Sequence, residues 1–404
     1  MARILTALIA VLILFPTIGT AEKNRKREQV TPIIKTPILQ TERPVWKFTP
    51  SISLQPKWGI KLYDTISITF IGDVMQHGKQ INDALIPGKD PNNASSYQYE
   101  YAFKHIEERL QAADLAVANM EFPMGLVPYS GYPLFSAPES ILYQAQKSGI
   151  DLFLLANNHL FDKGKRGFEK TLDVYEQANA VYTGAYRNRE QELEENPVFY
   201  NIKGIRVALI NFTYGTNGMP VPDPCTINLM DSTHVKECIA KAKEKGADII
   251  ICLPHWGEEY QLKPNDNQRK WARMLFREGA DIIIGGHPHV PQSGEYSSSK
   301  AIFYSLGNYI SNQTTPDYTQ LELMVTMRIQ KNSHTGETTL LPPIVEYLWC
   351  FKKDEFAPHY TVVPVEKIIG KKIDGINAFQ QERMERTYRS FLEKGLIREN
   401  ESLK

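Results

Sequence analysis

The chain is 404 residues long, which is enough for one large α/β domain of about 250 residues with extensions at its ends. Lysine and arginine together number 46, as do aspartate and glutamate, so the formal net charge is zero. This balance argues against the basic surface that nucleic-acid binding requires, and we expect no nucleic-acid partner. The function must therefore depend on local sites.

The first 21 residues have the pattern of an export signal. Arg3 precedes an apolar run over residues 4–15, and small residues follow at 19–21. The run is short for a membrane span of about 20 residues, although an uncleaved anchor remains an alternative. Residues 22–62 are rich in proline and basic residues and predict a linker. We expect an exported protein that is periplasmic, at the cell surface or anchored in the membrane by its N-terminus.

A repeating pattern of apolar strands and amphipathic helices begins near residue 63. Continuous apolar runs of this kind suit strands that are covered on both faces of a sheet. The predicted strands span 67–73, 114–121, 151–159, 206–214, 248–255 and 281–286. The spacing of apolar residues predicts helices over 99–112 and 232–245. The hexapeptide GADIII, at 246–251 and 279–284, places a glycine at two helix ends. The order indicates an α/β domain over residues 63–320.

The pattern changes after residue 320. Strand-like runs at 321–330, 338–350 and 360–365 predict a C-terminal extension, residues 321–404, that either completes a second sheet or caps the first. Apolar residues on one side of 377–396 predict a final helix. The four cysteines lack the paired spacing of a thiolate zinc site. A disulfide between Cys225 and Cys238 and free buried thiols both remain open.

Metal-binding and proton-transferring residue types stand at the ends of the predicted strands. They are Asp73, Glu121, Asn158 with His159, His255, and His287 with His289. Singly, Asp73 suits a helix N-cap or a turn, and His287 suits a surface histidine. Because ligand sites gather at the carboxyl ends of strands in open α/β sheets, we expect these side chains to converge. Mixed oxygen and imidazole donors favour Mn, Fe or Zn, and their number favours two adjacent ions that share a carboxylate.

Six segments in this order resemble the CapA (PgsA) family of poly-γ-glutamate capsule proteins. They are GDVM (72–75), ANME (118–121), ANNHLFDKG (156–164), HWGEEY (255–260), GADIIIGGHPHV (279–290) and YSLGNYISNQ (304–313). The resemblance covers about residues 66–313. That family is similar to the calcineurin-like metallophosphoesterases, which implies a four-layer α/β/β/α sandwich of the metallo-dependent phosphatase type with a two-metal site.

The resemblance also implies a role for each matching residue. The implied ligands are Asp73 and His289 for the first ion, Asn158, His255 and His287 for the second, and Glu121 as the bridging carboxylate. His159 would be the acid that protonates a leaving group, and Asp162 would orient it. Glu259 would lie near the substrate or behind the ligands, and a solvated loop charge is the alternative reading of this residue.

The sequence departs from the phosphoesterase pattern in its first segment. Phosphoesterases usually carry Asp-x-His there, but Met75 occupies the histidine position. His77 could substitute, and Gly286 replaces a residue that is commonly polar in the family. Whether one ion binds or two stays open for this reason.

The expected activity is metal-dependent hydrolysis of a phosphoester or of a γ-glutamyl amide. An anionic polymer would be guided by Lys79 and Arg166, together with Lys163 and Lys165, unless this basic stretch is only a solvated loop. The other expected partner is a membrane-bound capsule synthesis complex. The rival to an enzyme is an envelope scaffold or accessory subunit that uses the metal fold without catalysis.

Overall fold

The structure is a computed structural model that describes residues 31–32, 63–353, 355, 358–371 and 374–403. The predicted signal over residues 1–21 and most of the predicted linker over 22–62 lie outside the described residues. Within the ranges above, none of the helices combines the length and the apolar character that a membrane-spanning segment needs.

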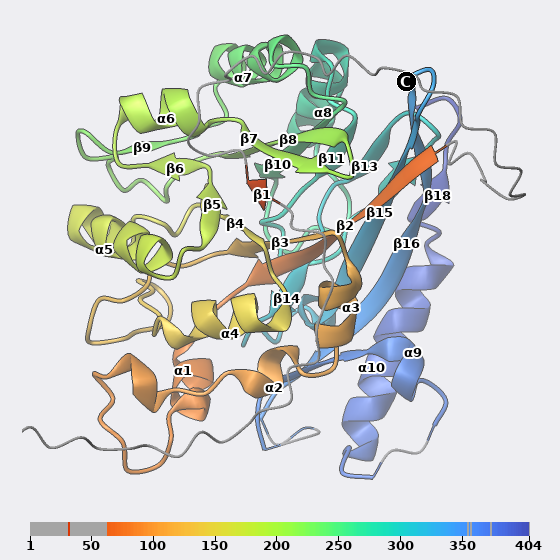
Figure 1. The fold of residues 1–404 in the computed structure, drawn as a ribbon. Coiled ribbons are helices and arrows are strands. Elements are labelled where there is room, and N and C mark those ends of the chain that lie inside the picture. The colour runs from red at the N-terminus through yellow and green to blue at the C-terminus, as the bar shows by residue number, and fades with distance from the viewer. Residues whose placement is uncertain (1–30, 33–62, 354, 356–357, 372–373, 404) are drawn as a thin grey trace, which may run out of the picture.

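Two large sheets form the centre of the described chain (Figure 1). The first, which we call sheet A, runs in the order β1 (Thr31–Pro32), β7 (Val198–Ile202), β8 (Ile205–Thr213), β10 (Ile249–His255), β11 (Ile282–Ile284), β13 (Ala301–Phe303), β12 (Gly294–Tyr296) and β18 (Ile397–Glu399). The second, sheet B, runs in the order β17 (Thr361–Pro364), β16 (Thr338–Phe351), β15 (Leu321–Asn332), β2 (Tyr63–Val74), β3 (Leu115–Met120), β4 (Leu152–Leu154) and β5 (Val181–Thr183), and β14 (Asn308–Ile310) also pairs with β2. A small separate pair joins β6 (Ala185–Tyr186) to β9 (Thr226–Ile227).

Helices lie outside both sheets. They are α1 (Gly78–Ala84), α2 (Glu100–Phe103), α3 (Glu107–Ala112), α4 (Ser140–Ser148), α5 (Gly164–Gln177), α6 (Arg189–Glu195), α7 (Ser232–Glu244), α8 (Asp266–Glu278), α9 (Val365–Ile368) and α10 (Ala378–Glu393), with 3-10 turns η1 (Ala94–Ser96) and η2 (Asp317–Gln320). Figure 1 shows α7 and α8 at the top and α2, α3 and α4 towards the bottom, with the sheets between them.

Alternation along the strands explains this layering. In β8, Val207 and Leu209 belong to the core between the two sheets, whereas Ala208 and Ile210 pack in the cluster beneath α7 and α8. Successive side chains of a strand point to opposite faces, so a strand that is apolar throughout must be covered on both sides. The same alternation in sheet B places side chains in the core between the two sheets and in a third cluster beneath α2 to α5. The four-layer α/β/β/α architecture expected from the sequence is confirmed.

The glycines of the two GADIII segments end helices as predicted. Gly279 follows α8 with a φ of 114°, and Gly246 follows α7 with a φ of 72°. These left-handed conformations favour glycine, because other residues meet a clash with their own Cβ there. At the start of α8, the Asn265 side chain accepts a hydrogen bond from the backbone N–H of Gln268 and so caps the helix. Strands β10 and β11 therefore begin at defined points.

The single helix predicted over 99–112 is wrong, because two short helices, α2 and α3, occupy this stretch. The Tyr309 hydroxyl donates a hydrogen bond of 2.5 Å to the carbonyl oxygen of Ala102. That oxygen would accept from the N–H of Ile106 in a continuous helix, but the Ile106 N–H bonds to Phe103 instead. The break lets Phe103 stack on the ring of Tyr309, with 5.2 Å between ring centroids.

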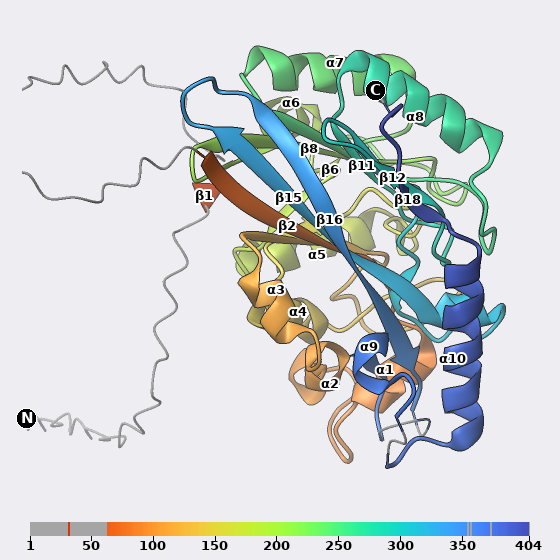
Figure 2. The same cartoon turned by 90° about the vertical axis from the view of Figure 1, so that its right-hand side faces the viewer.

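The C-terminal strands extend sheet B. β15 pairs antiparallel with β2 over Tyr63 to Phe70, and β16 and β17 follow in the same sheet. Figure 2 shows β15 and β16 as long ribbons beside β2, with α10 alongside them. Of the two alternatives for this stretch, completing a second sheet is the one observed.

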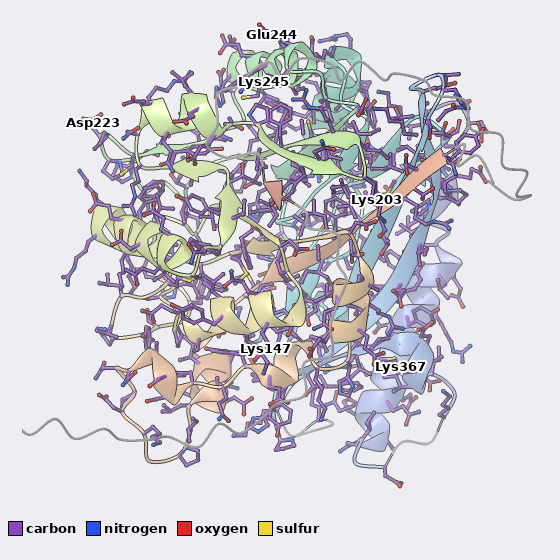
Figure 3. The ribbon with its side chains drawn as sticks, viewed as in Figure 1. Lys147, Lys203, Asp223, Glu244, Lys245 and Lys367 are labelled. Atoms are coloured by element: carbon purple, nitrogen blue, oxygen red, sulfur yellow. The ribbon has the colours of Figure 1, made fainter. Side chains whose placement is uncertain are left out.

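Charge and cysteines show no specialised feature in the described chain. Side chains of both signs, including Lys203, Asp223 and Lys367, lie around the outside of the ribbon in Figure 3. The cysteines at 225, 238, 252 and 350 are free and buried, so the disulfide alternative for Cys225 and Cys238 is wrong here.

Candidate metal centre

The carboxyl ends of strands from both sheets meet at one edge of the sandwich. Asp73 is near the end of β2, Glu121 follows β3, and His255 is the last residue of β10. Three groups there have one potential ligand atom per residue, all within 4.8 Å of each other. The groups are Glu121, His255 and His287; Asp73, Glu121 and His289; and Glu259, His287 and His289. The convergence expected from the strand ends is what the structure shows.

Asp73 is completely buried and is held on both carboxylate oxygens. Oδ1 accepts a hydrogen bond of 2.7 Å from Nδ2 of Asn119, and Oδ2 accepts one of 3.0 Å from the backbone N–H of His287. Burial acts to raise the pKa of Asp73, but the hydrogen bond and positive charge of His289 and the charge of His255 lower it overall. The carboxylate is therefore kept ionised, as a metal ligand must be.

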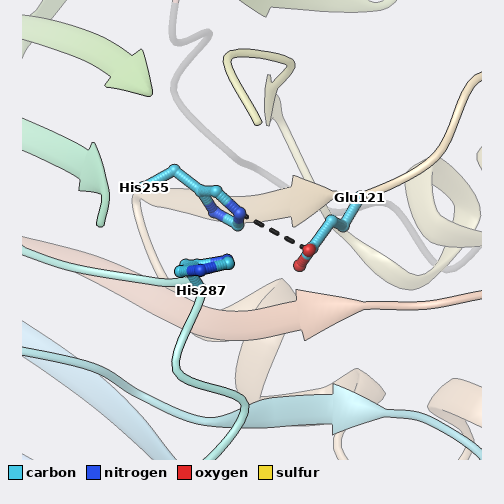
Figure 4. Close-up of side chains that lie close together, drawn as sticks. All are labelled: Glu121, His255 and His287. Carbon is cyan, nitrogen blue, oxygen red and sulfur yellow. Dashed lines mark ion pairs between the residues drawn. The ribbon is translucent and has the colours of Figure 1, made fainter. Parts of the chain in front are cut away.

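Glu121 is the clearest indication of a cation-binding site. Its side chain is completely buried, and neither Oε1 nor Oε2 has a hydrogen-bond partner among the described residues. Figure 4 shows the carboxylate facing His255 and His287, with 3.4 Å between Oε1 and Nε2 of His255. A buried carboxylate that lacks donors is costly, and a bound divalent ion removes that cost. The donor set fits a metal ion.

Amide groups contact two of the three imidazoles that sheet A and the loop after β11 supply. Nε2 of His255 lies 2.8 Å from Oδ1 of Asn158, and Nδ1 of His289 lies 3.0 Å from Oδ1 of Asn308. Nδ1 of His287 is buried without a partner, which leaves it available to a ligand. Burial and the neighbouring His255 and His289 lower the pKa of His287 well below its ordinary value. His287 is therefore neutral, the form that binds metal.

His287 and His289 have unusual backbone conformations. Their φ angles are 94° and 58°, which is the left-handed region that non-glycine residues seldom occupy. Strain of this kind persists where neighbouring contacts fix it, and it gathers at functional sites. Here the contact from the His287 N–H to Asp73 fixes it. A Cβ at Gly286 would lie 2.7 Å from Oδ1 of Asp73, so this departure from the family pattern makes room for the carboxylate.

His159 and Asp162 form a pair beside these groups. Nδ1 of His159 lies 2.9 Å from Oδ2 of Asp162, and that oxygen also accepts a 2.9 Å hydrogen bond from the backbone N–H of Phe135. The Phe135 ring packs edge-on against the imidazole at 4.7 Å. Burial acts to lower the pKa of His159, but Asp162 and Glu121 raise it above its ordinary value. The raised pKa favours the protonated form of this imidazole.

The remaining predicted residues lie at the surface. Glu259 is exposed but belongs to one of the three groups, and Lys79 and Arg166 are exposed on α1 and α5. Among the described contacts, neither basic residue forms a hydrogen bond or ion pair with a candidate ligand. Their guiding role stays a prediction. His77 lies against the ring of Phe135, and burial is the first of the causes that lower its pKa to about 4.

Two asparagines were missed by sequence reasoning. Asn119 bonds to Asp73 and lies 3.4 Å from Nδ1 of His255, so it links both sheets, and Asn308 orients His289. A polar residue inside an apolar strand, as in DLAVANME, was the available signal for Asn119. A buried amide must find hydrogen-bond partners, and a strand end is where they occur.

A family model places the chain among known proteins. Residues 67–313 match the model of the bacterial capsule synthesis protein PGA_cap. The chain belongs to this family. The matched residues of this PGA_cap chain include every candidate metal ligand and the His159–Asp162 pair.

Relatives of the PGA_cap chain carry capsule-related names. It is 32% identical to the capsule biosynthesis protein CapA of Bacillus anthracis over 62% of this chain and 61% of that protein. It is 30% identical to the PGA biosynthesis protein CapA of Bacillus subtilis over 70% of this chain and 73% of that protein. A probable polyglutamine synthesis accessory protein of Mycobacterium tuberculosis is 23% identical over 39% of this chain and 44% of that protein. The alignment thus spans less than two thirds of the first of these relatives.

Solved structures with some likeness to the PGA_cap chain include phosphoesterases. The calcineurin-like phosphoesterase YfkN of Bacillus subtilis has a TM-score of 0.40 and 14% identity, with 82% of this chain and 99% of that chain covered. The 5'-nucleotidase of Candida albicans has a TM-score of 0.41 and 14% identity, with 81% and 58% covered.

Proposed function

We propose that this PGA_cap protein is an exported, metal-dependent hydrolase that acts in the synthesis, processing or export of capsule or poly-γ-glutamate at the cell envelope. The observation that carries the proposal is Glu121, a buried carboxylate without hydrogen-bond partners that faces imidazoles beside a paired His159. A scaffold would have little use for either feature. The substrate is an anionic polymer or a phosphoester, and a membrane-bound capsule synthesis complex is the proposed setting.

The ligands divide naturally between two ions of the Mn, Fe or Zn class. Asp73, Glu121 and His289 would hold one, and Glu121, His255 and His287 with Asn158 the other. When bound, such ions would polarise a scissile carbonyl or phosphoryl group and lower the pKa of water to about 7. The first group contains a single imidazole, since Met75 is buried in the apolar core instead of joining it. We expect that ion to bind more weakly.

The residues of the chain supply the proton transfer. His159 donates a proton from its free ring nitrogen to the leaving group, and Asp162 fixes the ring through Nδ1. The N–H of Phe135 holds Asp162 in place, so the whole unit is rigid before substrate arrives. Its burial keeps bulk water from the imidazole.

Metal analysis and substrate panels test the proposal. The purified protein, loaded separately with Mn, Fe and Zn, is assayed on phosphodiesters and on γ-linked glutamate peptides. We expect turnover of one class that chelation abolishes and metal restores. Bound metal without turnover of either class would contradict the enzymatic proposal.

A non-catalytic scaffold or accessory role is the second candidate. It is favoured by the weak first group, which lacks the second imidazole, and by the word accessory in the name of the mycobacterial relative. His159→Ala separates the two roles in cells. If this variant retains metal and still supports polymer production at the wild-type level, the scaffold role holds; if production falls while metal stays bound, the enzyme role holds.

A further inference from the structure

The outer rim of the metal centre is formed by Tyr214, Glu259 and Tyr260. Of the residues in the three candidate groups, Glu259 alone is exposed. Tyr214 and Tyr260 are large exposed aromatic residues, and their rings lie 4.6 Å from His287 and 6.1 Å from His289 respectively. The rim therefore borders the two histidines on their solvent side.

The rim tyrosines are tied to the metal centre through amide side chains. The Tyr214 hydroxyl donates to Oδ1 of Asn217 at 3.2 Å, and the same oxygen accepts from Nδ2 of Asn158 at 3.1 Å. On the other side, Nε2 of Gln313 donates to the Tyr260 hydroxyl at 3.2 Å, and Oε1 of Gln313 accepts from Asn308 at 2.8 Å. Both rings are positioned by the groups that orient the ligands, as expected of a built site.

Tyr260 is held in a conformation that costs energy. Its φ of 67° lies in the left-handed region, and its N–H donates to the carbonyl of Pro288 at 2.8 Å. That proline stands between His287 and His289, so the strained residue is attached directly to the histidine pair. Backbone strain of this kind persists where neighbouring contacts fix it and gathers at functional sites, which supports a functional role for the rim.

In the described parts of the chain, the basic groups near the Glu259 carboxylate are the imidazoles of His287 and His289. No lysine or arginine there forms an ion pair with its carboxylate. His287 already belongs to the buried group with Glu121 and His255, and His289 already belongs to the buried group with Asp73 and Glu121. Once those groups hold metal, the Glu259 charge remains open to a cation from outside.

We propose that the rim binds the primary ammonium group at the amino end of a γ-linked glutamate chain. Exposed tyrosine faces attract an ammonium ion through their π electrons, and a carboxylate adds a charge-assisted hydrogen bond. The many carboxylates of such a polymer would be repelled by Glu259, whereas its single terminal ammonium would be attracted. This inference rests on the proposed function and assigns the site to the end of the polymer rather than to its interior.

The reaction at that end is the hydrolysis of the terminal γ-amide. The oxygen of water forms a bond to the amide carbonyl, the carbon–nitrogen bond breaks, and the leaving nitrogen gains a proton from His159, which a proton released by the water replaces. One glutamate and a chain shortened by one residue result, without an oxidant or reductant. Anchoring the ammonium would place the first amide of the chain, and no later one, at the metal centre.

Binding of a synthetic γ-linked glutamate trimer tests the proposal independently of turnover. Calorimetry with the metal-loaded full chain compares the trimer with its N-acetylated form, in D and L series. Acetylation removes the positive charge, so we expect roughly tenfold weaker binding. Equal affinity of the free and acetylated trimers would overturn the proposal.

Matched variants identify the residues responsible. Glu259→Gln should abolish the preference for the free amine, whereas Glu258→Gln, the same charge change at the adjacent exposed residue, should leave it intact. Tyr260→Phe keeps the ring and should keep the preference, but Tyr260→Leu should reduce it several-fold. A preference that survives in Glu259→Gln overturns the assignment.

The metal content of Glu259→Gln separates this role from metal binding. We expect the same number of bound ions as in the wild type. Loss of an ion would make Glu259 a metal ligand and overturn the inference. Preferential binding of the free amine without cleavage would support the inference while contradicting hydrolysis, so the two failures can be told apart.

Discussion

Sheet B brings oxygen donors to the candidate metal centre, whereas sheet A brings ring nitrogens. Asp73, Glu121 and Asn158 lie at or after the ends of β2, β3 and β4, while His255, His287 and His289 lie at or after the ends of β10 and β11. Oxygen donors alone suit Mg or Ca, and imidazoles shift the preference towards Mn, Fe and Zn. Neither sheet could bind such an ion by itself, so the metal centre is a property of the packed sandwich.

Glu121→Gln should have the largest effect on metal binding and activity. Glu121 is the oxygen donor common to two of the groups, and an uncharged amide cannot bridge two cations. Calorimetry should show loss of both ions, and activity should fall below detection. The wild type should gain about 2.7 kcal/mol of stability per bound ion at a free metal concentration of 100 times the Kd of that ion, and the variant should gain none. Wild-type metal affinity in the variant would contradict the bridging role.

His159→Gln should give the next largest effect. It tests whether the imidazole on the sheet B side is a metal ligand. His159 is an imidazole on the oxygen side, but its Nδ1 is bound to Asp162 and it belongs to none of the three groups. Turnover should fall by about 10²–10⁴-fold, and metal affinity should stay unchanged. His334→Gln, at the exposed β15–β16 turn, is the control and should alter neither quantity. A matching loss of metal would make His159 a ligand.

Asn119→Ala should weaken both halves of the centre at once. Its amide lies 2.7 Å from Oδ1 of Asp73 and 3.4 Å from Nδ1 of His255. Side chains that orient metal ligands typically contribute about 10–100-fold in affinity. Titration with Zn or Mn should show a loss in that range, whereas the exposed Asn92→Ala should show none. An unchanged affinity would mean that sheet packing alone positions the ligands.

The smallest effect is confined to the metal-free protein and depends on pH. Burial acts to lower the pKa of His289, but Glu121 and Asp73 of the opposite sheet raise it to about 9. A raised pKa stabilises the fold fully below pH 6.5, and that stability is lost as the pH rises through 9. Between pH 7.5 and pH 8.5, the free energy of unfolding measured by chemical denaturation should fall by about 1.4 kcal/mol more in the wild type than in His289→Gln. Saturating metal should remove this difference, because it displaces the proton.

The sequence predicted the strands and their polar ends well because buried parallel strands are apolar throughout. The run over 248–255 corresponds to β10, Ile249–His255, and the polar residue that ends it reaches the metal centre. Because side chains at the carboxyl ends of parallel strands share one edge, their meeting could be inferred without knowing the packing.

Contacts between distant residues could not be predicted in this way. The break between α2 and α3 depends on Tyr309, 207 positions after the carbonyl that it binds. The role of Asn119 depends on Asp73 in another strand, and the sequence shows only that an amide lies among apolar residues. Glu259 was recognised from its motif, but its exposure beside two tyrosines became visible only once the loops after β8 and β10 were placed together.

The position of Asp73 also has a consequence for the order of assembly. The N–H of Gly72 donates to Oε1 of Glu322, 250 positions later, and the N–H of Asp73 donates to the carbonyl of Gly307. An added Cβ at Gly72 would lie 2.0 Å from that carbonyl oxygen, so the strands fit together without spare room. Asp73 is therefore synthesised early but reaches its final position only after β14 and β15 have been made. Partly synthesised chains should be unable to capture a cation, and metal loading should be among the last events in the maturation of the protein.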